Sequence, residues 1–428
     1  MKLYNKNVLV YGLGKSGIAC VDFLSKFNAN VFVYDDNLNY KLKFKNFIDL
    51  DFDFQKIDLV VISPAVYQGE VLDRLKQLNK PIISEIQLAY EFFKGKIIAV
   101  TGTNGKTTTV SLIGKIFEEA GFDCVVCGNI GLPLISLYEG DYKDRVYILE
   151  VSSFQLEYST TFKPFVSCIL NIAPDHLNRH KNMENYSNIK FSICKNQSEE
   201  NYCILNKNLK HDFEKHKSFA KGLFFGSGAD CCEKDGKVFF QNEYVMPKSS
   251  IHLLGEKNLE NVLASVAVAK LFKIENKIIK QAIDSFNAIE HRIEFVDSVN
   301  GVIYINDSKA TNVASTLCAL ECFKNQRVIL LVGGIGKKED YSKIFEYSNL
   351  KLVICYGKAR EEIFECGKKC EFPNLTKHNN LKESLEMSFN NASAGDVVLL
   401  SPACASFDEF ENFEKRGEYF KGFVNEKK

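Results

Sequence analysis

Short apolar runs recur along this chain, and most of them end in Gly, Ser, Asp or Asn before a stretch of helical periodicity begins. This alternation is typical of α/β folds, in which helices connect the strands of a mostly parallel sheet. In open sheets of this kind, ligands bind beyond the carboxyl ends of the strands. We therefore expect an α/β protein whose binding sites lie in the loops that follow its strands.

A chain of 428 residues is longer than one domain usually is. The alternation of apolar runs and helical patterns also divides into three successive units. The expected domains are residues 1–93, 94–288 and 289–428. The second begins at the run KIIAVTGTNGKTTTV, and the third begins near HRIEFVD. The sequence thus predicts three α/β domains.

The first glycine loop lies in NVLVYGLGKSG, where Gly12-x-Gly14-x-x-Gly17 separates an apolar run from a helical pattern. The next apolar run, NVFVYDD, ends in Asp35 and Asp36. This is the order of a Rossmann fingerprint, in which a diphosphate lies at a helix N-terminus and an acidic residue binds a ribose. The residues alone indicate a bound diphosphate and leave an NAD-dependent dehydrogenase open.

The second glycine loop, TGTNGKTT at residues 101–108, is the strongest local signal. Its glycines let backbone N–H groups surround phosphate oxygens, while Lys106 supplies a charge and Thr107 a hydroxyl for Mg²⁺. The loop departs from a full Walker A pattern because Val100 stands where that pattern has glycine. We interpret it as a nucleoside triphosphate site, with a purely structural turn as the alternative.

Three downstream side chains follow strands or lie on a helix where such a loop could use them. Glu150 ends the run VYILE, a suitable place for a magnesium ligand. His176 follows the run SCILNI, and Lys190 lies in the helical pattern YSNIKFSI. Each of them, taken alone, is better explained as an ordinary surface, core or strand-end residue, and only the setting favours a function.

Composition excludes several classes of protein. Lys+Arg and Asp+Glu balance at 54 each, which disfavours nucleic acid or an anionic membrane as a partner. No apolar run reaches the roughly 18 residues of a membrane span, and no signal peptide stands at the N-terminus. The 14 cysteines are scattered, and Cys124-x-x-Cys127 has no second half to complete a zinc site. We expect a cytoplasmic protein with reduced, buried thiols.

Six motifs occur in an order that resembles the Mur ligases of peptidoglycan synthesis. They are TGTNGKTT, LEVSSFQLE, NIAPDH, HRIEF, NDSKATN and SPACASFDEFENFEKRG. The resemblance covers essentially the whole chain. The first motif and the His-Arg pair are shared with folylpolyglutamate synthases. The others resemble the family member that adds D-glutamate to UDP-N-acetylmuramoyl-L-alanine.

The resemblance implies a fold and a reaction. The fold would comprise an N-terminal Rossmann-like domain for the UDP-substrate, a central P-loop ATPase-type domain with a mostly parallel sheet, and a C-terminal Rossmann-like domain for D-glutamate. ATP would phosphorylate the substrate carboxylate, and the amine of D-glutamate would attack the resulting acyl phosphate through a tetrahedral intermediate. Catalysis would then consist mainly of positioning and charge stabilisation, and we expect a monomer.

The resemblance also implies roles for individual residues. Lys106, His176 and Lys190 would be catalytic, with Lys190 carbamylated by CO₂. Two Mg²⁺ ions would be held by Thr107, Glu150, His176 and carbamylated Lys190. ATP would be bound by Gly102, Thr103, Asn104, Gly105, Lys106, Thr107, Thr108, Asn258, Asn261, Arg292, Asp307 and Lys309.

The two other substrates would occupy the outer domains. The UDP-substrate would be bound by Gly14, Lys15, Ser16, Asp35, Ser63 and Asn129, so the first loop would bind this diphosphate rather than NAD. D-glutamate would be bound by Thr311, Lys337, Ser406, Phe407 and Phe413. Uracil contacts around Asp36 and Asn37 stay open, because some relatives carry a basic residue after the acidic pair.

Three other functions remain as alternatives to this reading. A different Mur ligase or a folylpolyglutamate synthase would release ADP with another acceptor. A nucleotide sensor with a vestigial phosphate loop would bind nucleotide without turnover. A DNA-binding ATPase is disfavoured by the zero net charge.

Overall fold

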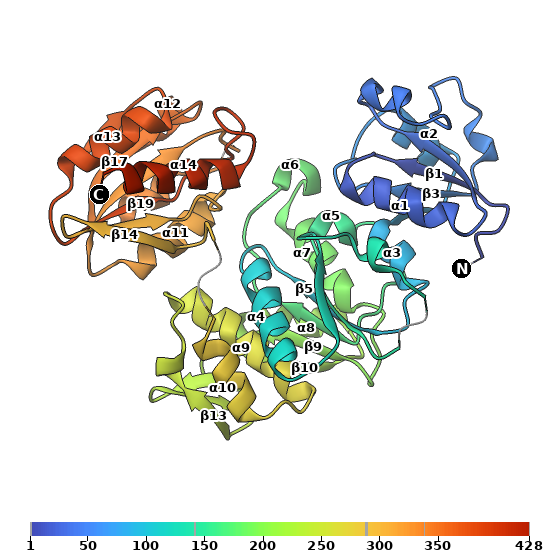
Figure 1. The fold of residues 1–428 in the computed structure, drawn as a ribbon, viewed down its shortest axis with the longest axis horizontal. Coiled ribbons are helices and arrows are strands. Elements are labelled where there is room, and N and C mark those ends of the chain that lie inside the picture. Colours follow the sequence, from blue (N-terminus) through green and yellow to red (C-terminus); the bar gives the residue numbers. More distant parts are fainter. Residues whose placement is uncertain (1, 141–142, 287–289, 338, 428) are drawn as a thin grey trace. The chain divides into compact units, whose positions relative to one another are not determined.

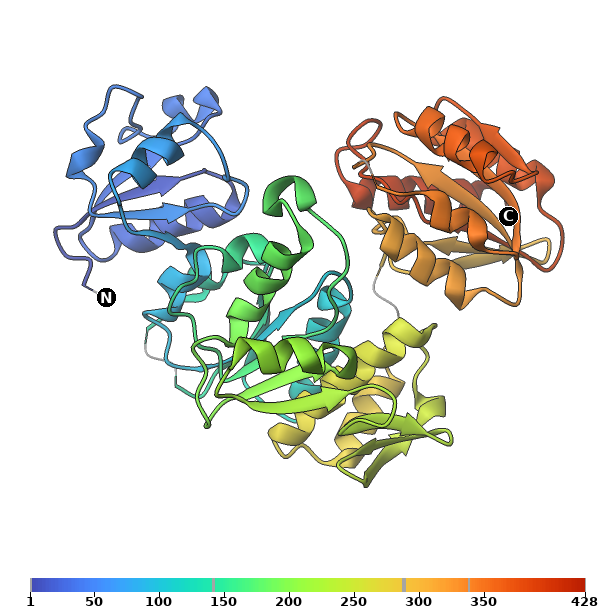
Figure 2. The ribbon, with the colours of Figure 1, turned by 180° about the vertical axis from the view of Figure 1, so that it is seen from behind.

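The computed structural model of the chain describes residues 2–140, 143–286, 290–337 and 339–427. These residues form three sheets flanked by helices (Figures 1 and 2). They divide into two compact units, one of residues 1–251 with 260–285 and the other of residues 252–259 with 286–428. The first unit contains two of the sheets and the second unit contains one.

The N-terminal sheet has four parallel strands in the order β2-β1-β3-β4. Val8 pairs with Val31 on one side and with Leu59 on the other, so β1 lies in the middle. The loops after β1 and β3 therefore meet at the point where the strand order reverses, which is where such sheets bind ligands. The elements are β1 (Asn7–Tyr11), α1 (Lys15–Ser25), β2 (Asn30–Tyr34), β3 (Leu59–Ile62), α2 (Glu70–Gln77), β4 (Ile82–Ser84) and α3 (Glu85–Tyr90).

The central sheet has nine strands in the order β13-β12-β11-β10-β9-β8-β5-β7-β6. Strand β5 lies between β7 and β8, and all three are parallel. The strands are β5 (Lys96–Thr101), β6 (Cys124–Gly128), β7 (Val146–Glu150), β8 (Val166–Ile169), β9 (Tyr202–Asn206), β10 (Lys221–Phe225), β11 (Cys231–Lys234), β12 (Lys237–Phe240) and β13 (Glu243–Pro247). The helices are α4 (Lys106–Glu119), α5 (Ser153–Leu156), α6 (Leu177–His180), α7 (Met183–Phe191), α8 (Lys210–His216), α9 (Glu256–Leu271) and α10 (Asn276–Asp284).

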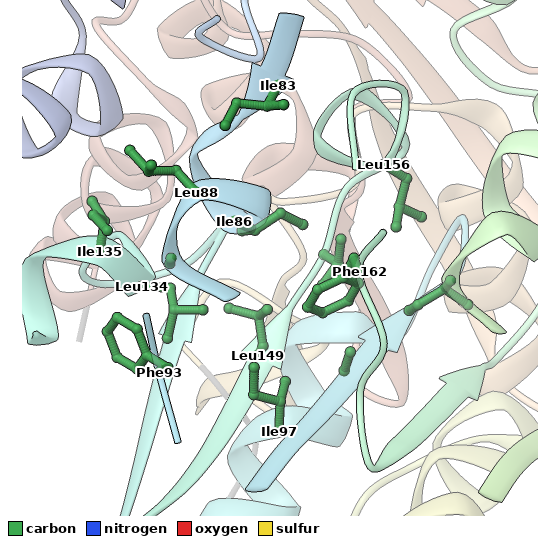
Figure 3. Close-up of a cluster of buried hydrophobic side chains, with 14 of the residues drawn as sticks. Ile83, Ile86, Leu88, Phe93, Ile97, Leu134, Ile135, Leu149, Leu156 and Phe162 are labelled. Atoms are coloured by element: carbon green, nitrogen blue, oxygen red, sulfur yellow. The ribbon is translucent and has the colours of Figure 1, made fainter. Parts of the chain in front are cut away.

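A continuous apolar core connects the first two sheets, which explains why they form one compact unit. Ile86 and Leu88 of α3 lie in the same buried cluster as Leu134 and Ile135, which belong to the short 3₁₀ helix η3 (Leu134–Leu137) (Figure 3). The cluster extends to Ile97 of β5 and Leu149 of β7 (Figure 3). Burial of this apolar surface holds β5 and β7 in fixed register beneath the second glycine loop.

The third sheet has six strands in the order β14-β15-β19-β16-β17-β18, and only β14 is antiparallel to its neighbour. Buried apolar clusters cover both of its faces. The strands are β14 (Glu294–Val299), β15 (Val302–Asn306), β16 (Arg327–Gly333), β17 (Leu350–Tyr356), β18 (Leu375–Lys377) and β19 (Asp396–Leu400). The helices are α11 (Val313–Cys322), α12 (Arg360–Lys369), α13 (Leu381–Asn391) and α14 (Phe413–Glu426).

The expected α/β class and its mostly parallel sheets are confirmed. The domain ranges 1–93, 94–288 and 289–428 remain predictions, and the limit between the second and third lies outside the described residues. No helix among the described residues combines the length and the apolar character that crossing a membrane requires.

Candidate active site

The second glycine loop connects β5 to α4, between the carboxyl ends of β7 and β8. Gly102 and Gly105 have φ angles of +154° and +85°, which favour glycine. A Cβ atom on Gly105 would lie 2.3 Å from Oδ1 of Asn261. Asn261 is buried, so this predicted ATP residue packs directly against the loop.

Two lysines meet at one backbone carbonyl of this loop. Lys106 Nζ donates to the carbonyl oxygens of Gly102 and Thr103, each at 2.8 Å. Lys190 Nζ donates to the same Gly102 oxygen at 2.9 Å. Burial, and next the charge of Lys106, lower the pKa of Lys190 well below its usual value. The structure therefore brings together both lysines that the sequence singled out.

Asparagine and tyrosine side chains that the sequence analysis did not identify hold the loop from the β8 side. The Asn104 N–H donates to Asn171 Oδ1 at 2.9 Å, and Asn171 Nδ2 donates back to the Asn104 carbonyl at 3.0 Å. Thr103 Oγ1 lies 3.2 Å from the hydroxyl of buried Tyr186, whose ring is 4.7 Å from Lys190 Nζ. Only the position of Asn171 just after a strand could have suggested this role.

Thr107 and Glu150 form the second cluster at the loop. Thr107 Oγ1 donates to Glu150 Oε2 at 2.8 Å, and both side chains are buried. Asn129 Nδ2 donates to Glu150 Oε1 at 2.8 Å, and its backbone N–H donates to the Glu150 carbonyl at 2.9 Å. Asn129, which the sequence analysis assigned to the UDP-substrate, thus fixes the orientation of the Glu150 carboxylate. Thr108 is buried in the first turn of α4.

His176 lies in the loop after β8 and adopts a left-handed backbone conformation, with φ at +54°. Its Nε2 is 3.5 Å from Asp175 Oδ2, and its ring centroid is 4.8 Å from that of Phe154. The described residues contain no group of three or more His, Cys, Asp or Glu side chains that could hold a metal ion. Thr107 lies in the first turn of α4, Glu150 is the last residue of β7, and His176 follows β8, so all three lie at the carboxyl ends of β5 and its two neighbours, where phosphate oxygens could complete a metal site.

The first glycine loop is built around Gly12 and Gly14. A Cβ on Gly12 would lie 2.6 Å from the Cβ of Ser63, so the loops after β1 and β3 are in close contact. Gly14 caps α1 without a side-chain hydrogen bond, which leaves the N–H groups at Lys15 and Ser16 for an anion. Asp35 accepts from the backbone N–H of Leu13 at 2.6 Å and of Asn37 at 2.8 Å, so it also stabilises the loop.

Of the predicted ATP residues of the second unit, Asp307 and Lys309 belong to the NDSKATN loop, Arg292 lies near Asp307, and Asn258 lies in the first turn of α9. Asp307 is buried and accepts from Ser401 Oγ at 2.7 Å and from the Ile293 N–H at 3.2 Å. Burial raises its pKa to about 7, and nearby Arg292 opposes that shift. Lys309 Nζ lies 4.9 Å above the ring of Phe413. Asn258 Nδ2 donates to the Leu254 carbonyl at 2.8 Å.

The predicted D-glutamate residues come from loops at one edge of the third sheet. Thr311 follows β15, Lys337 follows β16, and Ser406 and Phe407 follow β19; these strands are neighbours. Lys337 is exposed, Ser406 is buried, and Phe407 is 70% exposed. Lys338, which stands next to Lys337 in the sequence, lies outside the described residues.

Arg416 is a structural residue that the sequence analysis did not single out. Its guanidinium is fully buried and donates to Ser308 Oγ at 3.0 Å, to the Ser308 carbonyl at 2.8 Å and to the Cys404 carbonyl at 3.1 Å. These bonds connect the loop after β15 with the loop after β19. The long motif around Arg416 therefore shapes the edge of the sheet on which the predicted D-glutamate residues lie.

Comparison with known proteins defines the class of this fold and site. Residues 100–269 match the Mur ligase middle domain, and residues 291–404 match the Mur ligase glutamate ligase domain. MurF ligase from Thermotoga maritima in complex with ADP has a similar fold, with a TM-score of 0.65 and 16% identity over 100% of this chain and 97% of that chain. UDP-N-acetylmuramate-alanine ligase MurC from Thermotoga maritima gives a TM-score of 0.61 and 18% identity over 99% of this chain and 100% of that chain. The three-domain α/β architecture is that of these ligases.

Similarity to curated relatives extends over the full chain, which belongs to the Mur ligase family. The UDP-N-acetylmuramoylalanine--D-glutamate ligase of Caldicellulosiruptor bescii is 40% identical, over 100% of this chain and 99% of its own. The protein of that name from Clostridioides difficile strain 630 is 38% identical, over 99% of both chains. The resemblance inferred from the six motifs is confirmed.

Proposed function

We propose that this protein adds D-glutamate to UDP-N-acetylmuramoyl-L-alanine with conversion of ATP to ADP and phosphate. The observation that carries the proposal is the 40% identity over the full chain to ligases named for this reaction. ATP would phosphorylate the alanyl carboxylate, and the amine of D-glutamate would displace phosphate from the acyl phosphate and leave an amide. No protein nucleophile is needed, so the side chains act by positioning and by charge.

The phosphate loop is suited to the first step. Its glycines, the N-terminus of α4 and Lys106 provide donors for the phosphates of ATP. The Lys106 ammonium already lies over the loop, held by the Gly102 and Thr103 carbonyls. During phosphoryl transfer it would exchange these carbonyls for phosphate oxygens and stabilise the developing negative charge.

The Thr107–Glu150 pair fits Mg²⁺. A hydroxyl and a carboxylate oxygen 2.8 Å apart, both buried beside the phosphate loop, are hard oxygen donors of the type that Mg²⁺ binds. Phosphate oxygens and water would complete the octahedron. A bound Mg²⁺ would neutralise phosphate charge, while Asn129 would keep the Glu150 carboxylate aimed at it. A second Mg²⁺ near His176 belongs to the same proposal.

Lys190 fits carbamylation because its low pKa favours the neutral amine. In this reaction a C–N bond forms between Nζ and the carbon of CO₂, and one proton is released to solvent. The product carries a negative charge and two oxygens in place of a cation. The like charge of Lys106 disfavours the Lys190 cation and would favour the carbamate, so the two lysines would form an ion pair beside Gly102.

The remaining ligands are assigned to the outer domains. UDP-N-acetylmuramoyl-L-alanine would place its diphosphate at the N-terminus of α1, near Ser63 and Asp35. D-glutamate would bind at the edge of the third sheet, where the cation of Lys337 suits one of its two carboxylates. The proposal also includes the domain ranges 1–93, 94–288 and 289–428, a monomeric state and a cytoplasmic location.

An acceptor panel tests the proposed specificity. Purified protein is incubated with UDP-N-acetylmuramoyl-L-alanine, ATP, Mg²⁺ and one of D-glutamate, L-glutamate, L-lysine or diaminopimelate. The proposal predicts ADP release and an amide product of the correct mass with D-glutamate alone. Turnover with another acceptor would reassign the specificity. Nucleotide binding without turnover under every condition would leave only a nucleotide-binding role.

A further inference from the structure

Arg179 lies between His176 and Lys190 and has no part in the chemistry described so far. Its side chain is only 5% exposed. Its guanidinium Nε and Nη2 donate to the Glu157 carboxylate, with distances of 3.1 Å and 2.5 Å to Oε2. The remaining arm, Nη1, donates at 2.5 Å to the backbone carbonyl of Pro64. Pro64 is 115 positions away in the sequence, in the loop after β3.

Aromatic rings fix the plane of this guanidinium. Its carbon atom lies 4.0 Å from the ring centroid of Phe154 and 5.2 Å from that of Tyr67. Phe154 also packs on the His176 ring, at 4.8 Å between centroids. Arg179, in α6, is therefore held on one side by Phe154 of α5 and by Glu157 just after it, and on the other by Pro64 and Tyr67 of the loop after β3.

The Glu157 carboxylate balances the charge of the buried Arg179 guanidinium inside the protein. Burial raises the pKa of Glu157, but hydrogen bonds from His180 and Arg179 outweigh this effect and hold the pKa below its usual value. His180 is itself fixed, since its Nε2 lies 3.0 Å from Ser153 Oγ and its Nδ1 lies 3.2 Å from Glu157 Oε1. This network leaves the third arm of Arg179 free to hold the Pro64 carbonyl.

The loop held by this arm belongs to the first glycine-loop site. Ser63 contacts the Gly12 position, where a Cβ would lie 2.6 Å from that of Ser63 and 2.9 Å from Cγ2 of Val66. The Val66 N–H donates to the Ser63 carbonyl at 3.0 Å and closes the turn around Pro64. The other end of the network reaches His176, in the loop next to the ATP site. One guanidinium thus joins the walls of two predicted ligand sites.

We propose that Arg179 is a positioning residue, which holds the loop 63–67 so that the carboxylate of the UDP-substrate faces the γ-phosphate of ATP. This inference rests on the proposed function. Only a planar, forked cation can satisfy the Glu157 carboxylate and the Pro64 carbonyl together, so lysine cannot replace it. Because the residues assigned to ATP include neither Arg179 nor any residue of the loop 63–67, ATP binding should not depend on this network.

Steady-state kinetics of Arg179→Lys and Arg179→Ala test the proposal, with Arg145→Ala as the matched control. Arg145 also pairs with carboxylates, those of Asp123 and Glu139, but far from this loop in the sequence. We expect the KM for the UDP-substrate to rise, and kcat to fall, by about 10- to 100-fold in both Arg179 variants. The KM for ATP should change by less than about 2-fold, and the control should resemble the wild type. Millimolar guanidinium should partly restore Arg179→Ala.

Two further measurements keep the outcome decisive. Glu157→Gln preserves the side-chain shape and should shift the KM for the UDP-substrate in the same direction, even if the arginine variants do not fold. Calorimetric binding of UDP-N-acetylmuramoyl-L-alanine requires no acceptor, so it separates this inference from the identity of the amino acid. An equal rise of all three KM values in folded variants, or unchanged binding of the UDP-substrate, would overturn the proposal.

Discussion

Lys106 and Lys190 donate to the same oxygen, the backbone carbonyl of Gly102, at 2.8 Å and 2.9 Å. Two ammonium groups at this distance from one acceptor repel each other, and burial together with the charge of Lys106 lowers the pKa of Lys190. The phosphate loop therefore combines Lys106 with a second, buried lysine whose pKa is lowered. The proposed carbamate turns this repulsion into attraction.

Lys190→Ala should lose turnover by at least about 100-fold, because the proposed carbamate supplies a charge that alanine lacks. A short carboxylic acid such as acetate or formate should restore part of the activity by occupying the vacated space. Phosphate release measured across a carboxylate series checks this. The absence of any rescue in a folded variant would contradict the carbamate assignment.

Lys106→Ala should reduce turnover by about 1,000-fold or more, because phosphoryl transfer loses its cation. Lys115→Ala provides a control on the same helix, since Lys115 pairs with Glu119 at the surface. Thermal unfolding of both variants should match the wild type within a few degrees. Near-normal ATP use by Lys106→Ala would remove this loop from the reaction.

Asn129→Ala should raise the Mg²⁺ concentration needed for half-maximal activity by about 10-fold, because the Glu150 carboxylate loses its orienting amide. The KM for the UDP-substrate should change less than the Mg²⁺ requirement. A Mg²⁺ titration at saturating substrates measures the effect. A larger change in the KM for the UDP-substrate than in the Mg²⁺ requirement would instead assign Asn129 to the binding of the UDP-substrate.

The buried carboxyl of Glu85 makes the stability of the fold depend on pH. Burial raises the pKa of this carboxyl to about 7, and among the described residues its Oε2 has no hydrogen-bond partner. The folded chain therefore keeps the proton between pH 4.5 and about 7 while the unfolded chain releases it, so the free energy of unfolding falls as pH rises through this window. The loss amounts to about 3 kcal/mol.

Glu85→Gln removes this titration. The free energy of unfolding of the variant, minus that of the wild type, should therefore be larger at pH 8 than at pH 5. Thermal unfolding at the two pH values checks the prediction, with the exposed Glu118→Gln as control. A difference between variant and wild type that does not change with pH would show that Glu85 titrates normally.

Lys337→Ala should raise the KM for D-glutamate by at least about 10-fold and leave the KM for ATP within about 2-fold, because a carboxylate loses its cation. Initial rates with each substrate varied in turn measure both constants. Equal effects on the two constants would move Lys337 out of the amino-acid site.

The sequence predicted the parts of the site that depend on strand ends. The apolar runs before Gly12 and Thr101 are strands, Glu150 ends β7 and His176 follows β8, and these two strands are adjacent to β5. Buried parallel strands leave long apolar runs in a sequence, so these elements are easy to recognise. The meeting of Lys106, Lys190 and Thr107–Glu150 at one loop follows from that strand order.

Features that depend on tertiary contacts were missed. Strands β10 to β13 were not predicted, since their short, half-exposed segments carry weak periodicity. Helix α10 was not predicted either, although its buried Ile279, Ala282 and Ile283 recur at helical spacing. The Pro64 contact of Arg179 and the burial of Arg416 join segments more than 100 residues apart. No local pattern encodes such pairs, because a lone arginine in a sequence is usually a solvated surface residue.

The transfer of labelled oxygen tests the central claim most directly. UDP-N-acetylmuramoyl-L-alanine carrying ¹⁸O in its alanyl carboxylate is incubated with the protein, ATP, Mg²⁺ and D-glutamate, and the released phosphate is examined by mass spectrometry. Activation of that carboxylate by ATP predicts one ¹⁸O atom in phosphate for each amide formed. Unlabelled phosphate released alongside the amide would contradict the acyl-phosphate reaction.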